Sequence, residues 1–233
     1  MSNRPPRDRD NGALTPADAL AGLLARNRAW VKRKTAHDGL FFQRLLGQQR
    51  PDYLWIGCSD SRVPATEIVD LDPGEMFVHR NIANLTPADD ANFSAVLHYA
   101  VDQLKVRHIM VVGHYGCGGI WAAHNGLGDD VIGEWLSPVQ ALEHQHHEAL
   151  GKLDEAACLD KLCELNVIAQ VEQLCANPLI RQAWDEGQDL TIHGLIYGIG
   201  DGLLASVCES VSHPPADPIL SIGDAAKAEP QLP

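Results

Sequence analysis

Three side chains of the kind that bind zinc stand in two short loops. Cys58 opens the segment Cys-Ser-Asp-Ser-Arg, while His114 and Cys117 lie three positions apart in Gly-His-Tyr-Gly-Cys-Gly-Gly at 113–119. Thiolate and imidazole groups suit zinc, and a site with three protein ligands keeps a fourth position open for chemistry. The spacing leaves a second interpretation open, in which two core cysteines and a surface histidine bind no metal.

The first loop also carries an acid and a base two positions apart, Asp60 and Arg62. As an exposed ion pair they would contribute little to stability. Beside a metal, an oriented carboxylate would accept a hydrogen bond from metal-bound water and direct its lone pair toward a substrate. The pair therefore favours a catalytic metal over a structural one.

Short apolar runs bounded by turn residues predict the elements that position these loops. Four such runs predict strands, at 53–56, 76–78, 108–112 and 190–197. Buried parallel strands have this character, and the strand–helix alternation predicts an α/β fold with a parallel sheet covered by helices. Sites in such sheets form at the carboxyl ends of the strands, where both loops begin.

Two helical patterns lie between the predicted strands. Apolar residues spaced along 93–104 place one stripe on a helix. A second helix is predicted over 156–176, where Asn177-Pro178 ends it.

Other signals divide the chain into three parts. Thr15-Pro16-Ala17-Asp18 predicts the start of a helix that runs to about Lys34. We expect a flexible N-terminal arm at 1–12, a single domain over 13–212 and a proline-rich C-terminal tail at 213–233.

Composition excludes several classes of protein. The 233 residues are 45% hydrophobic and 21% charged, with a net charge of −13, a globular mixture that disfavours binding to nucleic acid or anionic lipid. Six cysteines without a Cys-x-x-Cys pair indicate a reducing compartment, and no apolar run is long enough for a membrane span. We therefore expect a cytoplasmic protein.

Three segments together resemble the beta-class carbonic anhydrases. They are Cys-Ser-Asp-Ser-Arg-Val-Pro at 58–64, Phe-Val-His-Arg-Asn at 77–81 and Gly-His-Tyr-Gly-Cys-Gly-Gly at 113–119. The resemblance extends from the first predicted helix to about Leu204, and every position of the metal and dyad pattern is present.

The resemblance implies a site and a reaction. Cys58, His114 and Cys117 would hold one Zn²⁺ per chain, with Asp60 and Arg62 as the catalytic dyad. The reaction would be reversible hydration of carbon dioxide to bicarbonate and a proton by a zinc-hydroxide mechanism. The family also implies a parallel four-stranded core sheet covered by helices. It further implies a homodimer in which the N-terminal helical arm packs on the partner, commonly paired into a homotetramer.

Three further positions resemble the bacterial-type subgroup with a non-catalytic bicarbonate pocket, namely Trp55, Arg80 and Tyr197. Taken singly, they could be a core tryptophan, a surface arginine and a packed tyrosine. The subgroup implies allosteric inhibition by bicarbonate, with Asp60 as a fourth zinc ligand in a closed state at low pH or high bicarbonate. Gln49 resembles a family glutamine that reaches the partner's substrate cleft.

Alternative functions remain open from the sequence alone. A sister hydrolase could act on carbon disulfide or carbonyl sulfide with the same scaffold. A thiol enzyme could use Cys58 as nucleophile and His114 as base, and a non-catalytic zinc module would need no open position. The histidine-rich segment 143–148 is interpreted as a solvated helix face, and Cys158 as a reduced thiol.

Overall fold

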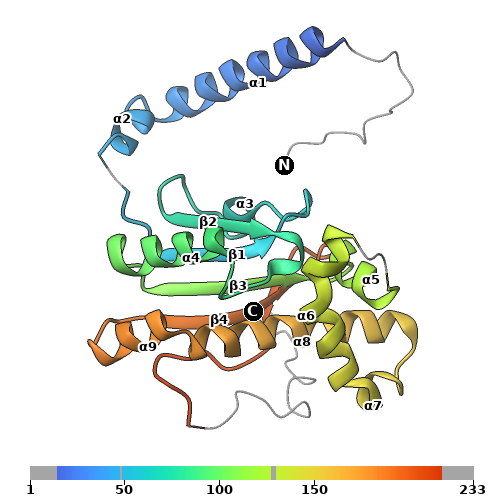
Figure 1. Cartoon of the computed structure of the whole chain (residues 1–233). Coiled ribbons are helices and arrows are strands. Elements are labelled where there is room, and N and C mark those ends of the chain that lie inside the picture. The colour runs from blue at the N-terminus through green and yellow to red at the C-terminus, as the bar shows by residue number, and fades with distance from the viewer. Residues whose placement is uncertain (1–14, 48, 127–129, 217–233) are drawn as a thin grey trace. The chain divides into compact units, whose positions relative to one another are not determined.

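The computed structural model describes residues 15–47, 49–126 and 130–216. The chain divides into two compact units, Met1–Gln48 and Gln49–Pro233 (Figure 1). The predicted arm at 1–12 lies outside the described residues, as does most of the predicted tail at 213–233. The domain boundaries predicted from the sequence stay predictions.

The described part of the first unit consists of α1 (Pro16–His37) and α2 (Phe41–Leu45). The Thr15 hydroxyl accepts a hydrogen bond from the Asp18 backbone N–H at 3.2 Å, so the predicted cap begins α1. The helix ends at His37, three residues beyond the predicted end. No side chain of this described helix is buried.

The second unit contains the sheet and the remaining helices. Its elements in chain order are β1 (Tyr53–Cys58), α3 (Ala65–Ile68), β2 (Met76–Asn81), the 3-10 helix η1 (Ile82–Asn84), α4 (Ala91–His98), the π-helical turn η2 (Tyr99–Gln103), β3 (His108–His114), α5 (Gly118–His124), α6 (Val131–Gln145), α7 (His147–Leu150), α8 (Glu155–Ala176), α9 (Pro178–Asp185), β4 (Thr191–Tyr197) and β5 (Leu204–Ser206).

The strands form one sheet in the order β2-β1-β3-β4-β5. The first four are parallel, which confirms the predicted four-stranded core. β5 is an antiparallel addition beside β4 that the sequence analysis missed, because three residues are too few to show an alternating pattern. Since β1 and β3 are neighbours, the loops that follow them lie at the same edge of the sheet.

The core is divided between the two faces of the sheet. Leu54, Ile56 and Cys58 point into the larger cluster, where α8 packs against β3 and β4 (Figure 1). Trp55 points to the other face and packs in a smaller cluster with Val63 from the loop after β1. The apolar runs are therefore buried on both faces, as parallel strands are.

The predicted end of the helix over 156–176 is confirmed. Asn177 ends α8 and its side chain accepts a hydrogen bond from the Leu179 N–H, which begins α9. The helix predicted over 93–104 is α4 continued by the π-helical turn. Among the described residues, no helix is long and apolar enough to cross a lipid bilayer.

Candidate metal centre

Cys58 and His114 are the last residues of neighbouring parallel strands, and Cys117 caps the N-terminus of α5. One ligand atom from each of the three residues lies within 4.8 Å of the other two. The two sulfur atoms are 3.8 Å apart. All three side chains are buried, and Cys58 is only 4% exposed, which disfavours the alternative of a thiol nucleophile open to substrates.

The His114 imidazole is oriented by its own loop. Its Nδ1 lies 3.0 Å from the Tyr115 carbonyl oxygen. A carbonyl can only accept, so Nδ1 carries the proton and Nε2 keeps its lone pair. Among the described residues Nε2 has no hydrogen-bond partner, although it is buried. A metal ligand has this arrangement, since its second nitrogen is normally held by a hydrogen bond.

The Cys58 and Cys117 sulfur atoms form a hydrogen bond with each other. The hydrogen bond from Cys117 lowers the pKa of the Cys58 thiol well below its usual range. The same hydrogen bond and burial raise the pKa of Cys117. A cation between the sulfur atoms would let both become thiolates, because a coordinating thiol is deprotonated. The donor set of two sulfurs and one imidazole nitrogen therefore fits zinc.

The structure adds backbone support that the sequence analysis missed. Backbone N–H groups of Asp60 and Ala83 donate to the Cys58 sulfur and help to lower its pKa. Ala83 and Asn84 have φ angles of 64° and 50°, a conformation that alanine rarely adopts. Asn84 is the one sequence signal for this turn, because asparagine tolerates the left-handed region.

Asp60 and Arg62 form a two-contact ion pair at the edge of the ligand group. Arg62 Nε donates to Asp60 Oδ1 at 3.0 Å and Nη2 donates to Oδ2 at 2.7 Å. These bonds lower the pKa of Asp60 to about 2. Asp60 Oδ2 also lies 3.8 Å from His114 Nε2. The structure thus holds an ionised carboxylate next to the three ligands.

A second feature of this pair ties the two loops together. Arg62 Nη2 also donates to the Gly116 carbonyl oxygen at 3.3 Å. The guanidinium group therefore fixes the Asp60 carboxylate and contacts the loop that carries His114 and Cys117.

The residues of the predicted bicarbonate pocket occupy one face of the sheet. Trp55 and Tyr197 belong to the same apolar cluster. The Trp55 Nε1 donor is buried without a partner among the described residues. A Cβ atom at Gly57 would lie 2.2 Å from this nitrogen, so glycine is required for the indole to lie there.

Arg80 is paired with Gly57 in the register of β1 and β2. Its Nε donates to the Cys58 carbonyl at 2.9 Å, and its Nη2 donates to the Asp60 carbonyl. Arg80 thereby holds the backbone of the first loop, a contact that sequence reasoning did not foresee. Gln49 is exposed in the segment before β1, and its contact with a partner stays a prediction.

Comparison with known proteins assigns the family. Residues 53–204 match the family described as carbonic anhydrase. The chain belongs to the carbonic anhydrase family. A carbonic anhydrase of Emericella nidulans is 43% identical over 183 residues, which cover 78% of this chain and 80% of that protein.

Solved structures place the chain in the beta class of carbonic anhydrases. The Coccomyxa beta-carbonic anhydrase in complex with acetazolamide is 39% identical, with a TM-score of 0.81 over 83% of this chain and 88% of that one. A tetrameric beta-carbonic anhydrase of Sordaria macrospora is 40% identical, with a TM-score of 0.79 over 83% of this chain and 98% of that one. The predicted family and fold class are confirmed.

Proposed function

We propose that this carbonic anhydrase hydrates carbon dioxide reversibly at a zinc ion held by Cys58, His114 and Cys117. The proposal rests on the buried His114 Nε2, which has no partner among the described residues, and on the three ligand atoms of His114, Cys58 and Cys117, which lie within 4.8 Å of one another. A zinc ion bound there would act as a Lewis acid that activates water near neutral pH.

Asp60 and Arg62 would orient the reacting water. With a pKa of about 2, Asp60 is ionised at neutral pH and is too weak a base to keep a proton. Its carboxylate can instead accept a hydrogen bond from the water and direct the oxygen lone pair toward carbon dioxide. Arg62 holds that carboxylate in place through its two contacts.

The experiment that tests this function is stopped-flow hydration of carbon dioxide from pH 6.5 to 9, on protein of measured zinc content. We expect turnover to scale with bound zinc and to rise with pH, because the reactive form of the water is deprotonated. One zinc per chain without turnover at any pH would contradict the assignment and would favour a structural zinc module.

We propose that the chain forms a homodimer that pairs into a homotetramer, and that it works in the cytoplasm. Leu20, Leu23 and Leu24 on α1 are exposed, which supports packing of this helix on a partner subunit. The similarity to the tetrameric Sordaria enzyme supports the larger assembly. The six cysteines are free thiols, in keeping with a reducing compartment.

We also propose that bicarbonate inhibits the enzyme from a pocket beside Trp55, Arg80 and Tyr197. An arginine and two ring donors can hold a planar anion, and the Trp55 N–H is the unused donor. Bicarbonate that draws Arg80 away from the Asp60 carbonyl would free that loop. The Asp60 carboxylate could then leave Arg62 and turn toward the three ligands, which closes the open position.

Trp55→Phe should weaken inhibition by bicarbonate. Losing one hydrogen bond to an anion should raise the half-inhibitory bicarbonate concentration about tenfold. The measurement is carbon dioxide hydration against bicarbonate concentration at constant pH and ionic strength. Trp184→Phe is the matched control, because its indole donates to the Leu190 carbonyl instead. Equal bicarbonate sensitivity in Trp55→Phe and the unmodified enzyme would refute the pocket.

A further inference from the structure

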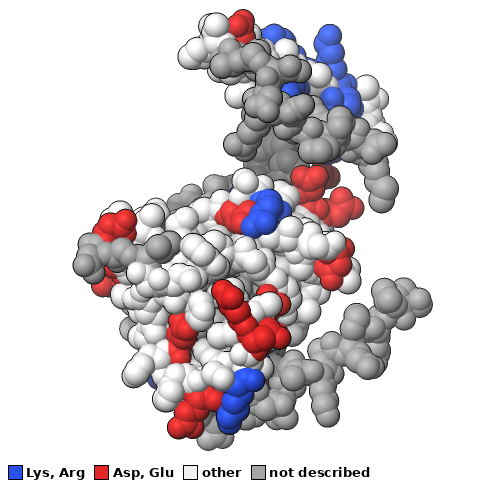
Figure 2. All heavy atoms as spheres, turned by 90° about the vertical axis from the view of Figure 1, so that its right-hand side faces the viewer, with Lys and Arg blue, Asp and Glu red and all other residues white. Residues whose placement is uncertain are grey.

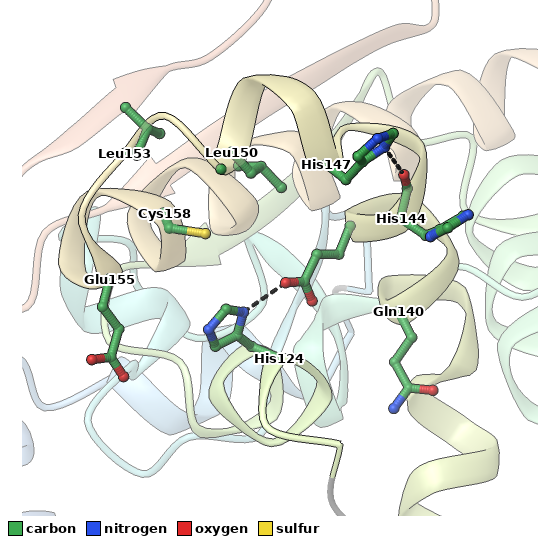
Figure 3. Close-up of a pocket in the computed structure, with 10 residues that line it drawn as sticks. His124, Gln140, His144, His147, Leu150, Leu153, Glu155 and Cys158 are labelled. Atoms are coloured by element: carbon green, nitrogen blue, oxygen red, sulfur yellow. Dashed lines mark hydrogen bonds and ion pairs between the residues drawn. The ribbon is translucent and has the colours of Figure 1, made fainter.

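A second group of metal-type side chains lies at the opposite end of α5 from Cys117. His124 is the last residue of α5, Glu143 lies on α6 and Cys158 on α8. One ligand atom from each of these three residues lies within 4.8 Å of the other two. His124 Nδ1 and Glu143 Oε1 are 2.7 Å apart, and the dashed line in Figure 3 marks this contact.

These side chains line a cavity of about 460 Å³. Figure 3 shows the Cys158 sulfur pointing into it, toward the pair formed by His124 and Glu143. Cys158 is 7% exposed, whereas the other two side chains are each 25% exposed. The ligand atoms are thus shielded but remain reachable from solvent on one side.

The electrostatic surroundings favour a cation. Glu155 lines the cavity together with Glu143, and none of the described lining residues is lysine or arginine. Figure 2 shows the side of the second unit that carries α5 and α6, where acidic side chains are spread over the surface. Carboxylates beside a cavity that lysine and arginine do not line attract positive charge.

We propose that His124, Glu143 and Cys158 form a second site for a divalent cation of the zinc type. Imidazole, carboxylate and thiolate together are a zinc donor set, whereas magnesium and calcium prefer oxygen ligands alone. The three ligands come from three different helices, so a bound ion would fasten α5, α6 and α8 together. This site is separate from the Cys58 group and does not depend on it.

Two other uses of the cluster are less consistent with the structure. A nucleophilic thiol needs a low pKa, yet burial and then the nearby Glu143 and Glu155 raise the pKa of Cys158. A chance site on the histidine-rich segment would use His144 and His147. Their rings stack with centroids 5.7 Å apart, and His147 Nδ1 donates to the His144 carbonyl.

From the sequence, segment 143–148 is interpreted as a solvated helix face, and Glu143 is an exception to this interpretation. Glu143 turns toward α5, where it meets His124, while His144 and His147 are not in the three-residue group. Sequence alone could not join these residues, because the partners of Glu143 lie on two other helices.

The test measures zinc retained by the full-length protein after loading with Zn²⁺ and gel filtration. We expect Cys158→Ser and Glu143→Gln each to retain one zinc per chain fewer than the unmodified protein. Cys208→Ser is the matched control, because Cys208 does not line the cavity, and it should retain the unmodified amount. With Co²⁺ in place of Zn²⁺, the near-ultraviolet sulfur-to-cobalt absorption per chain should fall in Cys158→Ser and not in Cys208→Ser.

Two results would overturn the site. Unchanged zinc retention in both Cys158→Ser and Glu143→Gln would show that the cluster binds no zinc. The contact between His124 and Glu143 would then be only a hydrogen bond that joins α5 to α6. Loss of the extra zinc only when His144 and His147 are both replaced by asparagine would assign it to a surface histidine pair. Glu143→Gln keeps the size of the side chain, so a folding defect in Cys158→Ser does not decide the matter.

Discussion

His114→Gln should remove the bound zinc and lower kcat/KM for carbon dioxide hydration by at least about 10⁴-fold. That loss corresponds to about 5 kcal/mol of transition-state stabilisation. The reason lies in Nε2, whose lone pair is aimed at the two thiols because Nδ1 is held by the Tyr115 carbonyl. A glutamine amide is a far weaker ligand than imidazole for zinc. Zinc content and stopped-flow rates measured on the same sample check both parts.

His98→Gln is the control for this change. His98 is exposed at the end of α4, where its ring contacts Asp102 at 3.3 Å. We expect His98→Gln to keep the zinc content and the carbon dioxide hydration rate of the unmodified enzyme. The prediction fails if His114→Gln retains a full equivalent of zinc and hydrates carbon dioxide within a few-fold of the unmodified enzyme.

Asp60→Asn should lower kcat/KM about 10²-fold while the zinc content stays unchanged. Asp60 lies outside the three-ligand group but within 3.8 Å of His114 Nε2, so its loss affects the orientation of water more than the binding of metal. The amide has one acceptor oxygen in place of two, and it no longer balances the charge of Arg62. Rates and zinc content again come from one preparation.

The chain offers a closely matched control in Asp52. Arg107 holds Asp52 through the same pair of contacts, with Nε–Oδ1 and Nη2–Oδ2 distances of 3.0 Å. That pair is exposed, with Asp52 just before β1 and Arg107 just before β3, at the opposite ends of these strands from Cys58 and His114. Asp52→Asn should leave the rate unchanged. Equal rates in the two variants, or loss of zinc from Asp60→Asn, would contradict the assigned role.

The sequence predicts the four parallel strands and the metal-type group because both depend on local signals. The apolar runs stop at Gly57 and Gly113, and the candidate ligands and dyad follow within five residues of each glycine. Packing requires glycine at position 113, because a Cβ atom there would lie 2.6 Å from Val167 Cγ2 on α8. The register of β1 against β3 then places the two loops together.

What the sequence misses depends on contacts between distant segments. Ala83 in the left-handed region has no local pattern, because its conformation is held by the Asn166 side chain on α8, which donates to its carbonyl. Arg80 resembles a surface arginine until β2 pairs with β1 and places its guanidinium beside the Asp60 backbone. Likewise, the cluster of His124, Glu143 and Cys158 exists only after three helices pack.

The pairing of β1 with β3 also bears on how the chain reaches its native state. Cys58 and Cys117 are 59 positions apart, so the ligand group closes only after a long-range strand pairing has formed. Side chains alternate between faces, and a one-residue slip of β1 would turn Cys58 toward the face of Trp55. Only the correct alignment brings both sulfur atoms to the same ion. Metal binding would therefore stabilise only the correct register of β1 and β3 during folding. Chains with a misaligned sheet would gain no such stabilisation and could unfold and pair again.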